Sequence, residues 1–162
     1  MKISHSCKVL IIIPILISSI RLKAQEQSIV KINGELKQWH KVTLDLTGPF
    51  ANETDVKPNP FMDYNMTVIF THESGTPTYK VPAYFAADGN AAQTSSNKGN
   101  VWRAHLSPDK VGKWDYSISF LKGERVAVNE CPNPEKVIPV DGLTGTFEIN
   151  KTDKKGIDLR AK

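Results

Sequence analysis

Apolar and polar residues alternate most clearly between residues 101 and 120, in two runs separated by a short loop. In the second run, the polar residues Asp115, Ser117 and Ser119 stand between apolar ones. The apolar positions of the two runs are Trp102, Ala104, Leu106, Trp114, Tyr116, Ile118 and Phe120. A period of two places these side chains on one face of a strand, so each run predicts a β-strand with one buried side. Trp102 and Trp114 are therefore predicted to be structural core residues.

The loop between the two runs carries residues that favour a tight corner. Pro108 presets φ for the first turn position, and Asp109 can bond its own backbone two residues on. Gly112 can take a positive φ where the chain enters the second strand. Pro108 and Gly112 are therefore predicted to have structural roles.

Six further runs have the composition of strands, and turn residues lie between them. These runs are residues 28–32, 36–46, 65–71, 78–86, 125–128 and 145–149. Asn33 and Gly34 predict a two-residue hairpin, Gly48 and Pro49 predict the end of a strand, and Pro82 favours a sheet edge. No long apolar pattern at helical spacing occurs. The pattern predicts an all-β fold, an immunoglobulin-like β-sandwich of seven to eight antiparallel strands, preceded by a signal peptide.

The N-terminus has the features of a secretory signal peptide. Basic residues precede an apolar run over residues 9–20, and Ala24 is small enough for a cleavage position. We therefore expect residues 1–24 to be a signal peptide, residues 25–150 the sandwich, and residues 151–162 a charged tail or the start of a linker. A retained membrane anchor is the alternative. Export predicts a secreted, periplasmic or cell-surface location in a bacterium, with no membrane attachment after cleavage.

The net charge of +4 belongs to this expected export signal. Its four charged residues are all basic, and the rest of the chain has 17 basic and 17 acidic residues. No basic run interleaved with aromatic residues follows, so the sequence argues against nucleic acid as a partner. After cleavage Cys131 is the one cysteine left, which excludes an internal disulfide. No motif in the sequence predicts a cofactor.

The residue types used in catalysis occur without the spacing that catalysis needs. Carboxylates are scattered over predicted strand faces and turns, and no Gly-x-Ser-x-Gly motif occurs. His40, His72 and His105 stand as isolated singletons without a second ligand at zinc-site spacing. We therefore predict no catalytic residues and no metal site.

Aromatic residues supply the one chemical hypothesis that the residues themselves support. Tyr and Trp rings stack on the apolar faces of sugars while their polar edges keep hydrogen bonds. If exposed, Trp39, Tyr64 and Tyr84 would form a glycan-binding face; the alternative is that they belong to the core. Phe61 is predicted to return to the core after the proline-rich surface segment 50–60.

Several short motifs stand in an order that resembles a known family. They are Asn59-Pro60-Phe61, residues 66–71, 81–85 and 101–103, and Pro108 followed by residues 112–116. Over residues 35–149 this order resembles the immunoglobulin-like N-terminal domain of unknown function of secreted bacterial glycoside hydrolases, especially those with an apiosidase-like or collagenase-annotated barrel.

The resemblance implies a secreted, non-catalytic accessory module of carbohydrate degradation that docks a catalytic barrel or contacts glycan. Its partners would be a glycoside hydrolase catalytic domain or a polysaccharide. The family pattern continues into a barrel, whereas this chain stops at Lys162, so we expect a truncated, split or free-standing module. The resemblance also suggests a structural role for Arg103, with its guanidinium bonded to a loop such as the one that holds Asp63.

Two alternatives from other classes stay open. One is a free-standing protein-binding or adhesion module that uses exposed sheet edges. The other is a small jelly-roll enzyme that acts on glycans. An enzyme predicts convergent carboxylates in a concave site, a docking module predicts a flat apolar patch, and a glycan binder predicts exposed aromatic rings.

Overall fold

The computed structural model of the protein describes residues 29–155. The expected signal peptide, residues 1–24, and the end of the expected tail lie outside the described residues. Within residues 29–155, no helix is long and apolar enough to cross a membrane.

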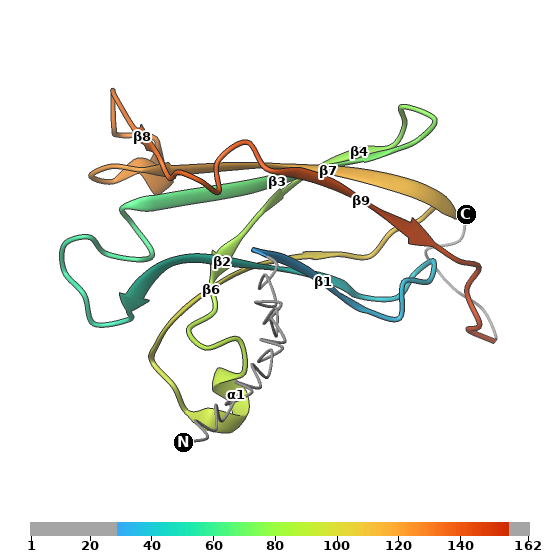
Figure 1. Ribbon diagram of the computed structural model, residues 1–162, viewed down its shortest axis with the longest axis horizontal. Helices are drawn as coiled ribbons and strands as arrows, with labels where there is room; N and C mark the ends of the chain where they lie inside the picture. The colour runs from blue at the N-terminus through green and yellow to red at the C-terminus, as the bar shows by residue number, and fades with distance from the viewer. Residues whose placement is uncertain (1–28, 156–162) are drawn as a thin grey trace, which may run out of the picture.

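The chain folds into two antiparallel β-sheets packed face to face (Figure 1). One sheet has the order β1-β2-β6-β5; in the other, the order is β4-β3-β7-β8, and β9 also pairs with β7. The strands are β1 (Val30–Gly34), β2 (Val42–Asn52), β3 (Tyr64–His72), β4 (Thr78–Pro82), β5 (Tyr84–Phe85), β6 (Lys98–Leu106), β7 (Gly112–Lys122), β8 (Glu135–Lys136) and β9 (Thr144–Ile149). This is the strand order of an immunoglobulin-like sandwich, so the predicted fold class is confirmed.

The two runs of clearest alternation form β6 and β7, one in each sheet. Trp102 in β6 and Trp114 in β7 are both almost fully buried, at 2% and 0% exposure. The inward faces of β2 and β3 complete the core with Leu44, Leu46, Val68 and Phe70 among others. The period-two pattern thus places the core residues of the central strands correctly.

Three structural features predicted from short sequence motifs are wrong, because the pairing of the backbone with more distant segments decides the local conformation. Asn33 and Gly34 end β1 instead of forming a two-residue hairpin, and the connection to β2 spans residues 35–41. Gly34 has φ of 116° and approaches Lys41 so closely that a Cβ would lie 2.4 Å from its carbonyl oxygen. β2 continues past Pro49 to Asn52 through a register shift. Residues 126–128 form a 3₁₀ helix, η1 (Val126–Val128), and not a strand.

The run over residues 78–86 divides between the two sheets. Its first part is β4, an edge strand that ends at Pro82, and its last part is β5, which pairs with β6 in the opposite sheet. Between them the Ala83 N–H donates to the carbonyl of Met66 at 2.9 Å. Figure 1 shows this green segment passing from the upper layer to the lower one. The crossing leaves one edge of the sandwich open to side chains from both sheets.

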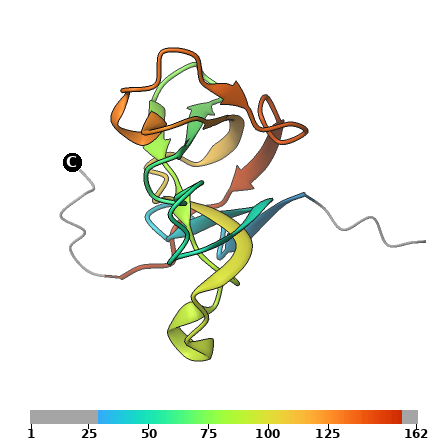
Figure 2. The ribbon, with the colours of Figure 1, turned by 90° about the vertical axis from the view of Figure 1, so that its left-hand side faces the viewer.

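The loop from β5 to β6 projects away from the body of the sandwich. It contains the short helix α1 (Ala91–Thr94), which extends below the β1-β2-β6-β5 sheet in Figure 2. The carboxylate of Asp88 accepts hydrogen bonds from the Asn90 backbone at 2.8 Å and the Thr94 hydroxyl at 2.6 Å. Side chains of this loop therefore order its backbone.

The corner between β6 and β7 is fixed by residues from both sheets. Pro108 is fully buried, and its carbonyl accepts the Trp39 N–H at 2.8 Å. Gly112 has φ of 120° and lies against Glu73, whose Oε1 atom would be 2.4 Å from a Cβ. The Tyr79 hydroxyl donates to the Asp109 carboxylate at 2.7 Å, which raises the pKa of Tyr79 to about 12.

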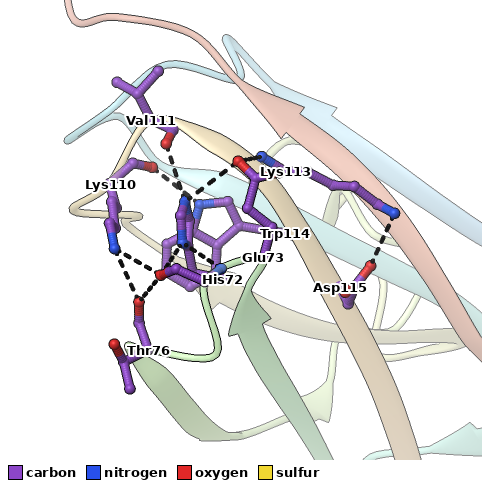
Figure 3. A network of polar contacts seen from close by, with 9 residues as sticks. His72, Glu73, Thr76, Lys110, Val111, Lys113, Trp114 and Asp115 are labelled. Carbon is purple, nitrogen blue, oxygen red and sulfur yellow. Dashed lines mark hydrogen bonds and ion pairs between the residues drawn. The ribbon is translucent and has the colours of Figure 1, made fainter.

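His72 ties the β3–β4 turn to the same corner (Figure 3). The ring is buried; its Nε2 lies 3.1 Å from the Val111 carbonyl oxygen, and its Nδ1 accepts the Ser74 backbone N–H at 3.2 Å. Because Nδ1 is an acceptor, Nε2 carries the proton and donates it to Val111. The Lys110 ammonium donates to the Ser74 hydroxyl at 2.8 Å and to the Thr76 carbonyl at 3.2 Å. His72 is therefore a hydrogen-bonded core residue.

Candidate functional site

A pocket of about 200 Å³ opens where the chain crosses between the sheets, and we call it the edge pocket. It is lined by Pro60, Phe61, Tyr64, Asn65, Met66, Pro82, Ala83, Tyr84, Phe85, Trp102 and Ala127. Tyr64, Met66 and Trp102 are buried, whereas Phe61 and Tyr84 are 51% and 47% exposed. The edge pocket thus has a closed apolar floor and two aromatic rings at its rim.

Aromatic contacts connect the rim to the core. The Phe61 ring meets the Phe85 ring edge-on, with 6.4 Å between centroids, and Phe85 in turn lies 5.3 Å from Trp102. Tyr64 lies 5.0 Å from Trp102 on the other side. Rings in such a cluster restrict one another, so the pocket is formed before any ligand arrives.

Polar contacts hold the other rim residue, Tyr84, from outside the pocket. Its hydroxyl lies 3.1 Å from Nε2 of His105, and Nδ1 of His105 lies 3.0 Å from the Thr43 hydroxyl. These residues lie on the adjacent strands β5, β6 and β2, facing outward from the sheet. The Thr43–His105–Tyr84 row therefore fixes the Tyr84 side chain beside the edge pocket.

His105 is expected to make stability depend on pH. Burial lowers its pKa, and the nearby charges of Lys41 and Arg103 lower it further. The unfolded chain therefore binds a proton more readily, and the free energy of unfolding is expected to fall as the pH drops from about 7.5 to about 5.5.

Urea unfolding at the two pH values measures this effect, with His105→Gln as the comparison. The variant is expected to lose less stability than the wild type over this range, because Gln does not titrate. An equal loss in both proteins would contradict the assignment to His105.

Arg103 makes the kind of side-chain contact that the resemblance suggests, but with a different partner. Its Nε and one Nη donate to the two carboxylate oxygens of Asp45, at 2.6 and 2.9 Å, and the same Nη donates to the Gly89 carbonyl at 2.9 Å. Asp45 raises the pKa of Arg103. The guanidinium thus joins β2, β6 and the start of the α1 loop.

The expected contact between Arg103 and the loop of Asp63 is therefore wrong. Asp63 accepts the backbone N–H groups of Asn59 and Arg125, both at 2.9 Å, and these bonds lower the pKa of its carboxyl group. Its carboxylate is satisfied by backbone donors that the sequence pattern did not reveal.

Two of the three candidate glycan-binding aromatics meet at the edge pocket, and the third lies elsewhere. Tyr84 stands at the rim. Tyr64 is buried at 6% exposure, so the alternative of a core position holds for this residue, although it lines the pocket floor. Trp39 is half-buried in the connection between β1 and β2, beside Pro108. Phe61, which we expected in the core, takes the exposed position instead.

His40 is not isolated, contrary to the sequence expectation. Its two ring nitrogens lie 3.4 Å from a Glu35 oxygen and 3.0 Å from an Asp153 oxygen. One ligand atom from each of these three residues lies within 4.8 Å of the others, a spacing that would suit a metal ion. However, the Lys37 ammonium pairs with both carboxylates and compensates one of their two negative charges. We therefore assign no metal to this cluster.

Neither of two other hollows has a carboxylate pair in the environment that a glycoside hydrolase needs. One, of about 320 Å³ beside β3, β7 and β9, is lined by one carboxylate, Asp115, and mainly by residues that carry a hydroxyl group. Another of about 310 Å³ is lined by Asp63 and Glu124. Asp63 has a lowered pKa, and Glu124 pairs with Lys57 at 3.2 Å, so neither has the environment of a general acid.

The family model that describes a domain of unknown function, DUF5060, matches residues 35–121. The chain belongs to the DUF5060 family. The matched residues of this DUF5060 domain include every aromatic residue of the edge pocket. No curated protein matches the chain. Among solved structures, the chain resembles a "putative glycoside hydrolase" from Bacteroides vulgatus with 19% identity and a TM-score of 0.47, over 73% of this chain and 16% of that one.

Proposed function

We propose that this DUF5060 domain is a secreted, non-catalytic accessory module of carbohydrate degradation that contacts glycan through the edge pocket. The observation that carries the proposal is the pair of exposed rings, Phe61 and Tyr84, at the rim of a preformed pocket. Aromatic faces next to hydrogen-bonding groups suit sugars, whose rings have apolar faces and polar edges. Export to the periplasm or cell surface would place the domain where polysaccharides are degraded.

A non-catalytic role agrees with the state of the carboxylates. Glycoside hydrolysis needs two carboxyl groups across one bond, one of them with a raised pKa. No carboxylate lines the edge pocket. We propose that catalysis belongs to a glycoside hydrolase domain with which this module is associated, either in one polypeptide or as a partner.

Affinity electrophoresis in gels that contain soluble polysaccharides tests the glycan contact. At least one polysaccharide is expected to retard the purified chain, and Phe61→Ala with Tyr84→Ala is expected to weaken that retardation at least about tenfold. Phe50→Ala is the matched control, because Phe50 is 69% exposed and lies outside the edge pocket. Its retardation should equal that of the wild type.

Two results would contradict the proposal. One is release of new reducing ends by the purified chain, which would make it an enzyme. The other is an absence of retardation by every polysaccharide, which would favour the protein-binding alternative. Binding of a separately expressed glycoside hydrolase catalytic domain would then identify docking as the function.

A further inference from the structure

The edge pocket has features that go beyond general glycan contact. The volume of the pocket and the lack of charged residues in its lining indicate which part of a glycan it accommodates. The inference below rests on the proposed function and specifies the ligand of the same site.

The pocket is small and closed at its inner end. Its volume is about 200 Å³, below the roughly 300–1,000 Å³ of pockets for drug-sized ligands. Tyr64, Met66 and Trp102 close the floor, with exposures of 6%, 2% and 2%. A chain cannot pass through a closed floor. The shape therefore suits a single ring at a chain end or on a branch.

The lining carries no charged side chain. Two cations near pocket residues have other contacts. Arg103 is held by Asp45 and Gly89, and Lys122 lies 5.8 Å from the Tyr64 ring centroid but lines a different hollow. A carboxylate or sulfate that entered the edge pocket would lose its water without gaining a charged partner. The pocket therefore favours an uncharged ligand.

Hydrogen-bonding capacity remains at the pocket wall. The Asn65 amide makes two long contacts, from Nδ2 to the Val126 carbonyl at 3.4 Å and from the Thr67 hydroxyl to Oδ1 at 3.5 Å. An amide has two donor hydrogens and two acceptor lone pairs, so one donor and one acceptor stay available. The Tyr64 hydroxyl has no hydrogen-bond partner among residues 29–155. These groups can meet ring hydroxyls.

We propose that the edge pocket binds one uncharged sugar ring, from a chain end or a branch, at the rim that Phe61 and Tyr84 line, and that His105 is a positioning residue for Tyr84. The ring stacks on the exposed aromatic faces, and its hydroxyl groups bond to Asn65. His105 contributes through its contact with the Tyr84 hydroxyl, because it fixes the orientation of that ring.

Saturation-transfer NMR on the full purified chain tests the ligand class with a matched pair of probes. A panel of neutral methyl glycosides includes methyl glucopyranoside, and its charged counterpart is methyl glucopyranosiduronate. At least one neutral glycoside is expected to bind, at least about tenfold more tightly than the uronate, and Phe61→Ala should abolish its signal. Phe50→Ala should leave the signal unchanged.

The positioning role is tested with two variants at one site. His105→Phe is expected to weaken binding of the neutral glycoside about threefold to tenfold, and His105→Gln, which keeps a hydrogen-bonding group near Tyr84, should restore it. A general loss of folding would weaken both variants alike. Equal binding by wild type and His105→Phe would overturn the positioning role.

The outcomes separate this inference from the proposed function. If a polysaccharide retards the chain but no neutral glycoside binds, or the uronate binds equally well, the single-ring inference is wrong and the proposed function stands. If neither polysaccharide nor glycoside binds, both are wrong. If an apolar protein segment occupies the edge pocket instead, neither polysaccharide nor glycoside will bind, and the purified chain will bind a catalytic domain.

Discussion

Trp114→Ala is expected to lower the free energy of unfolding by about 3 to 5 kcal/mol, because it removes a large side chain from a closed core. Trp114 is fully buried in β7. Its ring stacks on Tyr79 at 5.9 Å and meets His72 edge-on at 5.4 Å, and its indole N–H donates to the Lys110 carbonyl at 3.0 Å. The substitution leaves a cavity where both sheets meet the β6–β7 corner, so the His72 network loses its packing partner (Figure 3).

Equilibrium unfolding in urea measures this change as a shift of the midpoint at constant slope. Trp114→Phe is the matched control: it keeps an aromatic ring and gives up the indole hydrogen bond, so its loss should be clearly smaller. A loss below about 1 kcal/mol for Trp114→Ala would show that the side chain does not belong to the core.

Arg103→Met is expected to cost about 1.5 to 3 kcal/mol of stability, the range for hydrogen bonds to charged groups. The side chains of Arg103 and Asp45 are 21% and 19% exposed, so the pair is largely shielded from water. Methionine retains the apolar stem but leaves the Asp45 carboxylate with the Asn33 amide, at 3.1 Å, as its remaining side-chain partner. The Gly89 carbonyl also loses its donor.

A double-mutant cycle with Asp45→Asn separates the pairing energy from other effects of each substitution. The two changes together should cost less than the sum of the single changes. Arg125→Met serves as the control, because the Arg125–Glu130 pair is exposed and should leave unfolding almost unchanged. If Arg103→Met leaves stability unchanged, the structural role of Arg103 is wrong.

The strand faces could be read from the sequence because alternation is a local property. A period of two decides which side chains share a face, so Trp102, Trp114 and Phe120 were placed in the core without knowledge of the fold. The prediction of a two-residue hairpin at Asn33 and Gly34 is wrong because it relied on a local signal that has two meanings. Glycine also occurs where strands approach closely, and the local sequence does not separate the two uses.

The edge pocket could be predicted only in part. An aromatic site that includes Tyr84 was expected, but Phe61 was assigned to the core, because a large hydrophobic residue is usually buried. Its exposure follows from the crossing between β4 and β5, which opens the sandwich edge beside it. Pro82 indicated a sheet edge, and nothing in the sequence indicated that the chain would change sheets there.

By itself the sequence determined an all-β sandwich, the inward faces of its central strands and the tight corner at Pro108 and Gly112, since each depends on neighbours a few positions apart. The tertiary structure alone decided that Arg103 pairs with Asp45, that His40 meets Asp153, and that Phe61 and Tyr84 flank one pocket. These residues are far apart along the chain. Strand pairing and sheet packing bring them together, and no local pattern records which distant partners will meet.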